Sequence, residues 1–190
     1  MSESVLKKLA GAFPEKVKST YQNEGGNWVA LVEPEALVEV AKWLRDEPSM
    51  DFDMLRDVVS LDFQGYTARP VATRYALAYP IYSIGKKHEI VLRVELDGEE
   101  PTVPSLTPVW KAANWGEREA WDMMGIRFTG HPDLRRVLLY EEFEGHPLRK
   151  DYDKRKSQPR MDLLKPERDA LAEYKKWDRE YDGQTKSTAS

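Results

Sequence analysis

The signal that decides the fold lies in residues 74–96, RYALAYPIYSIGKKHEIVLRVEL. In the second half of this stretch every other residue is apolar, which is the period-two pattern of a strand with one buried face. The alternating residues are Ile90, Leu92, Val94 and Leu96. A similarly apolar arm, Arg74 to Ile84, comes before them, and Gly85-Lys86-Lys87 separates the two arms. The stretch therefore predicts two adjacent antiparallel strands.

The residues before this hairpin predict further helices and strands. A short helix over residues 5–12 is stopped by Pro14, and Pro34 opens a second helix that Pro48 ends. The second helix carries apolar residues at helical spacing, namely Leu37, Val40, Ala41 and Leu44. Residues 27–32 and 54–63 are apolar enough for strands, although the spacing in 54–63 also suits a helix.

The predicted fold class is α+β, a two-layer sandwich of a mixed, largely antiparallel sheet with helices on one face, plus an extended C-terminal tail. We expect a globular domain over residues 1–152 and a tail over residues 153–190. The tail is net positive, whereas the rest of the chain is net negative, and it has few apolar residues for its length. We therefore expect it to dock on a partner, in part through a charged helix from Pro166 to Tyr181.

A third helix is predicted over residues 115–124. Asn114 is a preferred N-cap residue, and Glu117 follows three positions later, as in a capping box. Gly125 is a natural residue to end the helix. Residues 137–140, Val-Leu-Leu-Tyr, predict a short strand beyond it.

Composition excludes several kinds of chemistry. The 190 residues carry a formal net charge of −4 and include no cysteine, which excludes disulfides, thiol nucleophiles and ordinary iron–sulfur ligation. No glycine-rich spacing suits the phosphates of a nucleotide, and the basic residues are too diluted by acidic ones for a nucleic-acid footprint. No apolar stretch approaches the ~20 residues that span a bilayer, and no signal segment leads the chain, so we expect a cytoplasmic location.

The first candidate site is a carboxylate cluster around an arginine, formed by Glu117, Arg118, Glu119 and Asp122. Arg118 and Asp122 are four residues apart and can pair on one helix face. The cluster is therefore predicted to be a capped, partly exposed helix start with a local ion pair. Catalytic carboxylates would have to face one another across a cleft, which neighbouring helix positions do not achieve unaided.

The second candidate is a repeated Gly-His-Pro. It occurs as Gly130-His131-Pro132, followed by Arg135 and Arg136, and as Gly145-His146-Pro147, followed by Arg149, Lys150 and Asp151. Glycine permits a positive φ and proline fixes its own φ, so each histidine is expected on a stiff turn. Nearby cations disfavour a divalent metal, and the turns are predicted to anchor the histidines in a buried or interfacial position. The six tryptophans are the third candidate, as core residues or as interface anchors.

Residues 117–136, EREAWDMMGIRFTGHPDLRR, and residues 144–152, EGHPLRKDY, closely resemble the signature of the C-type subunit of bacterial NADH:quinone oxidoreductase. This is the 30 kDa subunit of respiratory complex I. The resemblance continues more weakly upstream through Val103 to Thr107 and Ala113 to Trp115, and it does not extend past about residue 152.

The resemblance implies a non-catalytic structural subunit in the peripheral arm of a proton-translocating complex that transfers electrons from NADH to quinone. It implies packing against the quinone-pocket partner, the 49 kDa, D-type subunit. No cofactor, metal or catalytic residue is expected on this chain, and NADH, FMN, iron–sulfur clusters and quinone are expected on other subunits. The chain is then held peripherally at the cytoplasmic face of the cell membrane, through the complex alone.

Two other interpretations remain open. The same module is reused in membrane-bound hydrogenases and ferredoxin-linked complexes, so the chain could be a homologous subunit of one of these. A stand-alone hydrolase would instead use Glu117, Glu119, His131 and His146. A hydrolase works alone, whereas a subunit is recovered with a larger redox assembly.

Overall fold

The computed structural model describes residues 2–67 and 73–159. The chain divides into two compact units, residues 1–156 and 157–190, and every element below belongs to the first. The predicted helix over residues 166–181 lies outside the described residues. The domain boundary predicted after residue 152 stays a prediction, as does the docking role of the tail.

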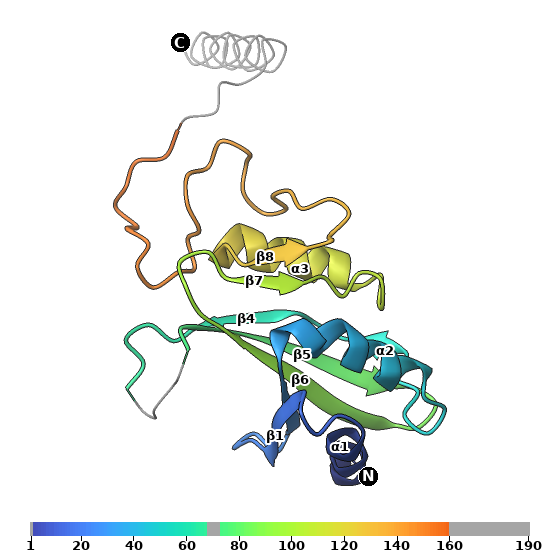
Figure 1. Cartoon of the computed structure of the whole chain (residues 1–190). Coiled ribbons are helices and arrows are strands. Elements are labelled where there is room, and N and C mark those ends of the chain that lie inside the picture. Colours follow the sequence, from blue (N-terminus) through green and yellow to red (C-terminus); the bar gives the residue numbers. More distant parts are fainter. Residues whose placement is uncertain (1, 68–72, 160–190) are drawn as a thin grey trace, which may run out of the picture. The chain divides into compact units, whose positions relative to one another are not determined.

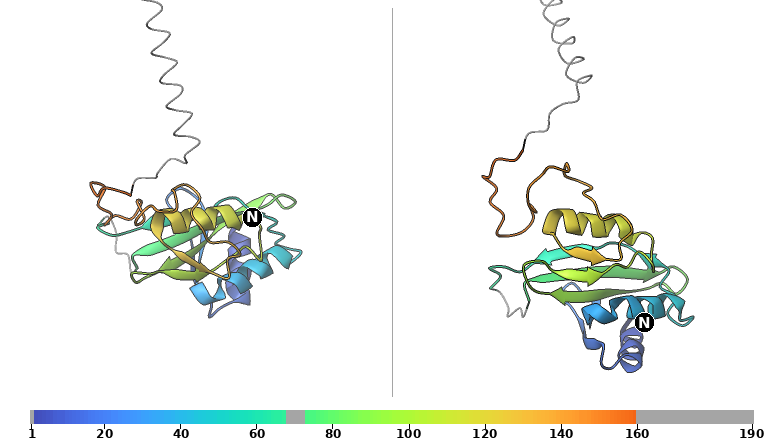
Figure 2. Two further views of the ribbon diagram at one scale, coloured as in Figure 1. Left: turned by 90° about the horizontal axis from the view of Figure 1, so that it is seen from above. Right: turned by 45° about the horizontal axis from the view of Figure 1, so that its top comes forward.

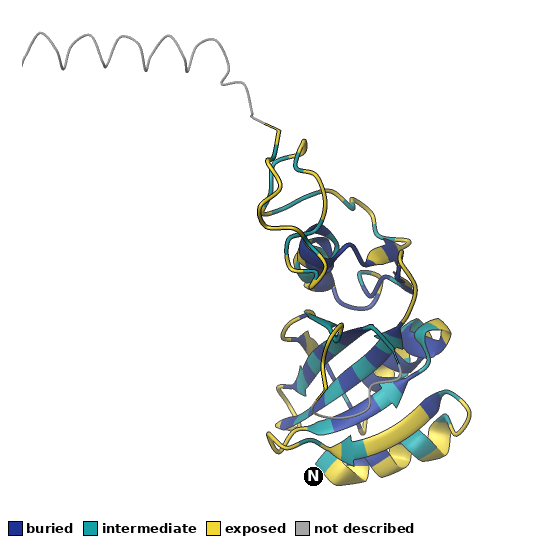
Figure 3. Cartoon of the chain, turned by 90° about the vertical axis from the view of Figure 1, so that its left-hand side faces the viewer, coloured by how far each residue is buried: buried dark blue, intermediate teal, exposed yellow. Residues whose placement is uncertain are grey.

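The hairpin forms the centre of the sheet and confirms the prediction. Strands β5 (Tyr75–Ser83) and β6 (His88–Leu96) pair antiparallel along their whole length, from Tyr75 opposite Leu96 to Ser83 opposite His88. Burial alternates along both strands, which Figure 3 shows as bands of buried and intermediate residues. One face of the sheet therefore belongs to the core, and the other stays partly accessible.

The other strands complete a mixed, largely antiparallel sheet. The order is β1-β2-β6-β5-β3, from β1 (Val17–Gln22) and β2 (Trp28–Val32) to β3 (Met54–Leu55), and β4 (Val59–Asp62) also pairs with β5. Strand β2 runs parallel to β6, while the pairs β1–β2, β3–β5, β4–β5 and β5–β6 are antiparallel. No apolar pattern in the sequence indicated β1, because this edge strand is mostly exposed and polar.

Three α-helices cover the core face of the sheet. Figure 1 shows α2 (Leu37–Asp46) in front of the strands, after the short 3-10 turn η1 (Pro34–Ala36), with α1 (Ser2–Ala12) near β1 and α3 (Ala113–Met124) near β4. Their buried side chains join those of β5 and β6 in one core cluster. Figure 2 shows the same helices and strands from two further directions. The predicted two-layer arrangement is confirmed.

Helix α3 is framed by a small second sheet. Strand β7 (Thr102–Pro104) leads toward the helix, and β8 (Arg127–Thr129) follows it and pairs parallel with β7. Gly125 ends the helix with φ at 70°, as predicted.

Two local predictions around α3 are wrong. The helix begins at Ala113 rather than after an Asn114 cap, because the N–H groups of Ala113 and Asn114 already donate to the carbonyls of Trp110 and Lys111. The capping box therefore does not form. Residues 137–140 form a bend instead of a strand, because the backbone N–H groups of the first three donate to the side chain of Asp122.

Candidate functional site

The signature residues meet around Asp122, whose side chain is fully buried on α3. Its Oδ2 atom accepts hydrogen bonds from the N–H groups of Val137, Leu138 and Leu139 at 3.0, 2.9 and 3.0 Å. Its Oδ1 atom accepts one from Arg136 Nη1 at 2.6 Å. Burial alone would raise the pKa of Asp122, but these four hydrogen bonds outweigh it and lower the pKa below its ordinary value. Asp122 is therefore an ionised, buried acceptor whose hydrogen bonds fix the bend at 137–139.

Arg136 connects Asp122 to the second Gly-His-Pro segment. Its Nη2 atom donates to the carbonyl oxygens of Phe143 and Gly145, at 2.7 and 3.1 Å. Its guanidinium also lies over the rings of Trp121 and Phe143, at 5.8 and 5.7 Å from their centroids. Arginine is suited to this position, because its planar fork can serve a carboxylate and two carbonyls while its faces contact aromatic rings.

The second Gly-His-Pro segment caps the C-terminal end of α3. A helix leaves its last four carbonyl groups without intrahelical partners, and buried ones need donors. His146 Nδ1 donates to Asp122 O at 2.9 Å, and the Leu148 N–H donates to Met123 O at 3.0 Å. Arg149 donates from Nε to Met124 O at 2.6 Å and from Nη2 to Gly125 O at 3.4 Å. This segment is thus anchored by hydrogen bonds to the carbonyl groups at the end of α3.

His146 serves this cap in its neutral form. Burial lowers its pKa, and the cations of Arg149 and Arg136 lower it further, while the bond to Asp122 O opposes them. Gly125 leaves room for the same contacts, because a Cβ atom there would lie 2.5 Å from His146 Cδ2 and 2.6 Å from Arg149 Nη2. Besides its positive φ, close approach of the capping segment requires glycine at this position.

Residues 149–151 are also tied to the sheet. The guanidinium of Arg149 lies 5.5 Å from the ring centroid of Tyr75, at the start of β5. The Lys150 N–H donates to Asp62 Oδ2 at 2.9 Å. Arg74 bridges Asp62 and Asp151, with nitrogen–oxygen distances of 3.1 and 2.9 Å. The signature therefore connects the end of α3 to the edge of β4 and β5.

The predicted pair between Arg118 and Asp122 does not form. Arg118 instead donates to the carbonyl oxygens of Arg135 and Arg136, at 3.1 and 2.9 Å, and lies over the ring of Trp115 at 4.8 Å. Only 6% of Arg118 is exposed, and Glu117 and Asp122 are fully buried. The predicted partial exposure is therefore wrong for Glu117, Arg118 and Asp122, although Glu119 is exposed. The coil after β8 folds back and supplies the partners of Arg118 and Asp122, whereas the loop before α3 supplies those of Glu117.

Glu117 faces the loop between β7 and α3 rather than the helix cap. Its Oε1 accepts from the Leu106 N–H and its Oε2 from the Ser105 hydroxyl, both at 2.6 Å. Burial raises the pKa of Glu117 to about 7, although the two hydrogen bonds oppose this rise. The buried hydroxyl of Tyr79, which has no hydrogen-bond partner among the described residues, has its pKa raised by burial and secondarily by the charge of Glu117. The Glu117 carboxyl group is therefore poised to change its protonation state near neutral pH.

His131, in the first Gly-His-Pro segment, lies near the start of α3. Its Nδ1 accepts the Asp133 N–H at 3.0 Å, so Nε2 carries the proton in the neutral ring and donates to Asn114 O at 3.2 Å. Its Nε2 also lies 4.0 Å from Glu117 Oε2. Gly130 has φ at 78° and Gly145 has φ at 90°, as predicted for stiff turns.

The four residues of the hydrolase interpretation are not brought together. Glu117 and His131 approach each other near the start of α3, whereas His146 lies at its end, against Asp122 O. Glu119 is exposed on the helix surface. Within residues 2–67 and 73–159, no three histidine, aspartate or glutamate side chains gather as metal ligands.

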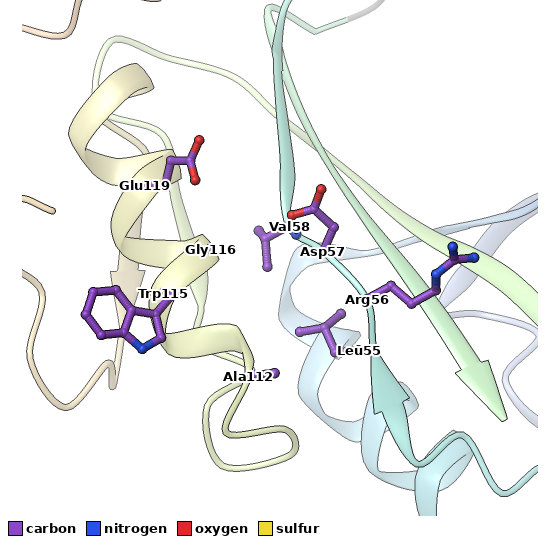
Figure 4. Close-up of a pocket in the computed structure, with 8 residues that line it drawn as sticks. All are labelled: Leu55, Arg56, Asp57, Val58, Ala112, Trp115, Gly116 and Glu119. Carbon is purple, nitrogen blue, oxygen red and sulfur yellow. Dashed lines mark hydrogen bonds between the residues drawn. The ribbon is translucent and has the colours of Figure 1, made fainter. Parts of the chain in front are cut away.

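A cavity of about 250 Å³ lies beside α3, against the link between β3 and β4. Figure 4 shows Ala112, Trp115, Gly116 and Glu119 on the helix wall and residues 55–58 on the other. The two walls approach each other closely at Gly116, where an added Cβ atom would lie 2.8 Å from Val58 Cβ.

Several residues that complete the site were missed by the sequence analysis. They are Asp62, Arg74 and Tyr75 at the sheet edge, and Tyr79, Ser105 and Leu106 around Glu117. Each lies outside the signature, and no spacing within the sequence relates them to it. The partial resemblance over Val103 to Thr107 was the one signal that pointed toward Ser105 and Leu106.

Comparison with known families gives a match over residues 30–158. The matching family is described as respiratory-chain NADH dehydrogenase, 30 Kd subunit. The matched range includes strands β3 to β6, α3 and both Gly-His-Pro segments.

Two relatives illustrate the similarity. The chain is 45% identical over 127 residues to the NADH-quinone oxidoreductase C 2 subunit of Rhizobium meliloti (strain 1021), which covers 67% of this chain and 66% of that protein. It is 41% identical over 148 residues to the NADH-quinone oxidoreductase C-type subunit of Roseiflexus sp. (strain RS-1), covering 78% and 82%. The match thus spans just under two thirds of the Rhizobium protein.

Solved structures share the fold. A trypsin-resistant fragment of Nqo5, described as residues 1–134 of that protein, is 31% identical with a TM-score of 0.59 and covers 70% of this chain and 98% of the fragment. A chain from the structure of an archaeal respiratory membrane complex, the membrane-bound sulfane sulfur reductase, has a TM-score of 0.65 at 16% identity, with 86% and 96% covered. The second likeness concerns the fold alone.

Proposed function

Because the chain belongs to the family of the 30 kDa subunit of respiratory-chain NADH dehydrogenase, we propose that it is a non-catalytic structural subunit in the peripheral arm of a proton-translocating NADH:quinone oxidoreductase. In this role it supports electron transfer from NADH to quinone without taking part in the chemistry. The family membership carries the proposal, and the geometry of the signature supports it.

The supporting observation is how the charged signature residues are used. Asp122, Arg136 and Arg149 each make their hydrogen bonds to groups of this same chain, and most of these groups are backbone carbonyls or N–H groups. Such contacts hold residues 130–151 against α3 as a rigid surface. A reacting centre would instead present polar groups toward a cleft.

The proposed division of labour follows from the side chains of this chain. With no cysteine it has no thiolate for an iron–sulfur cluster, and no glycine-rich spacing suits the phosphates of NADH or FMN. The proposal accordingly assigns NADH, FMN, the clusters and quinone to other subunits. The principal proposed partner is the 49 kDa, D-type subunit, which helps to form the quinone pocket. Among the described residues, no helix has the length and apolar character to cross a bilayer. We propose peripheral attachment at the cytoplasmic face of the membrane through the complex.

The test is purification of the full-length tagged chain from membranes of its own cells. We expect it to co-purify with the other subunits and with NADH:quinone reductase activity. Calorimetry with NADH and metal analysis of the isolated full chain should show stoichiometric binding of neither NADH nor iron. Recovery as a free protein, or together with hydrogenase subunits, would contradict the proposal.

A further inference from the structure

The cavity between α3 and the β3–β4 link has features of a docking surface for another protein. Its volume is about 250 Å³. A second hollow of about 460 Å³ adjoins it, since Leu55 and Ala112 line both. Two adjoining hollows suit neighbouring side chains of an extended segment, and we refer to them together as the groove.

An anchoring aromatic residue stands at the rim of this groove. Trp115 is 64% exposed, the highest value among the large apolar side chains of the described ranges. It is nevertheless held in place, because Arg118 lies over its ring and is itself bonded to two backbone carbonyls. Met54, which is 44% exposed, lies along the second hollow. Exposed but fixed aromatic side chains are typical energetic anchors of protein interfaces.

The charges around the groove define what it can accept. Asp57 and Glu119 lie on opposite walls, and Figure 4 shows both carboxylates toward the same end of the cavity. Asp57 accepts a hydrogen bond from the N–H of Val58, and neither carboxylate has a cationic partner in the described structure. The nearby cation does not neutralise them, because Arg56 points away from α3 and pairs with Glu89 at 2.5 Å.

We propose that this groove binds an arginine-containing loop of another subunit of the complex. The guanidinium lies between Asp57 and Glu119, and an apolar side chain beside it packs on Trp115 and the apolar floor at Leu55 and Val58. Arginine fits better than lysine, because its planar fork can serve two carboxylates and can stack on an indole. This inference rests on the proposed function, since it requires the chain to work within an assembly.

Charge reversal in the full-length chain tests the groove. We expect Glu119→Arg to lower the recovery of the other subunits about tenfold after a high-salt wash, because it places like charges together in the interface. Trp115→Ala should have a similar effect, and the melting temperature of each purified variant should match that of the wild type. Glu24→Arg, which makes the same charge change at an exposed position in the β1–β2 turn, should leave recovery unchanged.

A photo-cross-linker identifies the occupant. With benzoylphenylalanine at position 115, cross-linking in the intact complex should capture a peptide of another subunit that contains an arginine close to the linked residue. A link to a second copy of the chain, to its own tail, or to no protein in an assembled complex would overturn the proposal. If wild-type chain co-purifies with the complex but Glu119→Arg does so equally well, the groove proposal alone fails. If the wild type does not co-purify, the proposed function fails as well.

Discussion

Glu117 and Asp122 are buried carboxylates on the same helix, and their surroundings move their pKa values in opposite directions. Burial acts on both in the same sense, by disfavouring the charged form. Glu117 accepts two hydrogen bonds, whereas Asp122 accepts four, one of them from an arginine. The stronger desolvation of Glu117, together with the larger number of donors to Asp122, therefore decides the sign of each shift.

The raised pKa of Glu117 predicts a specific pH dependence of stability. Its pKa rises from 4.5 to about 7 on folding, so the folded state binds the proton more tightly than the unfolded state. The unfolding free energy should then fall as pH increases from about 4.5 to 7 and level off above, by a total of about 3 kcal/mol. In Glu117→Gln this contribution is absent, so denaturant titrations should show the variant gaining stability relative to wild type across that window.

The matched control for this measurement is Glu119→Gln, an exposed carboxylate two positions along the same helix. Its stability difference from wild type should stay constant over the same range of pH. A constant difference for Glu117→Gln as well would show that Glu117 does not titrate in this range.

Asp122→Asn should destabilise the domain by about 2–4 kcal/mol, because one of the two oxygen acceptors becomes an amide donor facing other donors. The partly buried charge of Arg136 also loses its counter-ion. Denaturant unfolding measures the loss, and limited trypsin digestion should show faster cleavage after Arg136 and Arg149. The control is Asp133→Asn, which removes an exposed ion pair with Arg135. Equal digestion of the two variants would contradict the inference that Asp122 fixes the bend at 137–139.

At the scale of elements, α3 and the coil that follows it behave as one unit. The coil is irregular because its donors are engaged by Asp122 and by the end of the helix rather than by a neighbouring strand. Its two glycine turns set where the chain reverses, so their conformations determine whether the histidines reach their carbonyl partners. Figure 1 shows this coil running beside α3 after β8.

Replacing the turn glycines separates backbone strain from crowding. Gly130 and Gly145 both have positive φ, but a Cβ atom meets nothing within 4 Å at Gly130 and lies 3.2 Å from the Tyr152 ring at Gly145. Valine at either position should cost about 1–3 kcal/mol, with the larger loss at Gly145. Thermal unfolding measures both, with Gly11→Val, at an open site without positive φ, as the control. Unchanged stability in both turn variants would contradict the strain argument.

At the scale of the whole molecule, the domain and the tail are expected to have different roles. The described contacts of residues 153–159 include an ion pair between Lys156 and Glu144, whose side chains are both more than half exposed. Exposed pairs of this kind contribute little to stability. Among the described residues, the buried core cluster is drawn from residues 5–128, and partly buried side chains as far as Leu139 pack against it.

Truncation after Tyr152 should therefore leave the melting temperature of the chain nearly unchanged. It should weaken incorporation into the complex, because the charged tail is predicted to gain order by binding a partner. Calorimetry of the truncated chain and its recovery with the other subunits measure the two effects. An unfolded truncated chain would show instead that the tail belongs to the domain's core.

Local sequence patterns were sufficient to predict the hairpin, the helices, the end of α3 at Gly125 and the family. These depend on the period of apolar residues, on proline and glycine at element ends and on a contiguous signature, all of which act within a few residues of one another. The partners of the charged residues, in contrast, follow from packing between distant parts of the chain. Asp122 and Arg136 are 14 positions apart and Lys150 bonds to Asp62 across 88, so these contacts form only when the coil folds back over α3. The local pairing expected of Arg118 and the cap expected of Glu117 failed for this reason, because buried groups take the donors and acceptors that the packed chain brings to them.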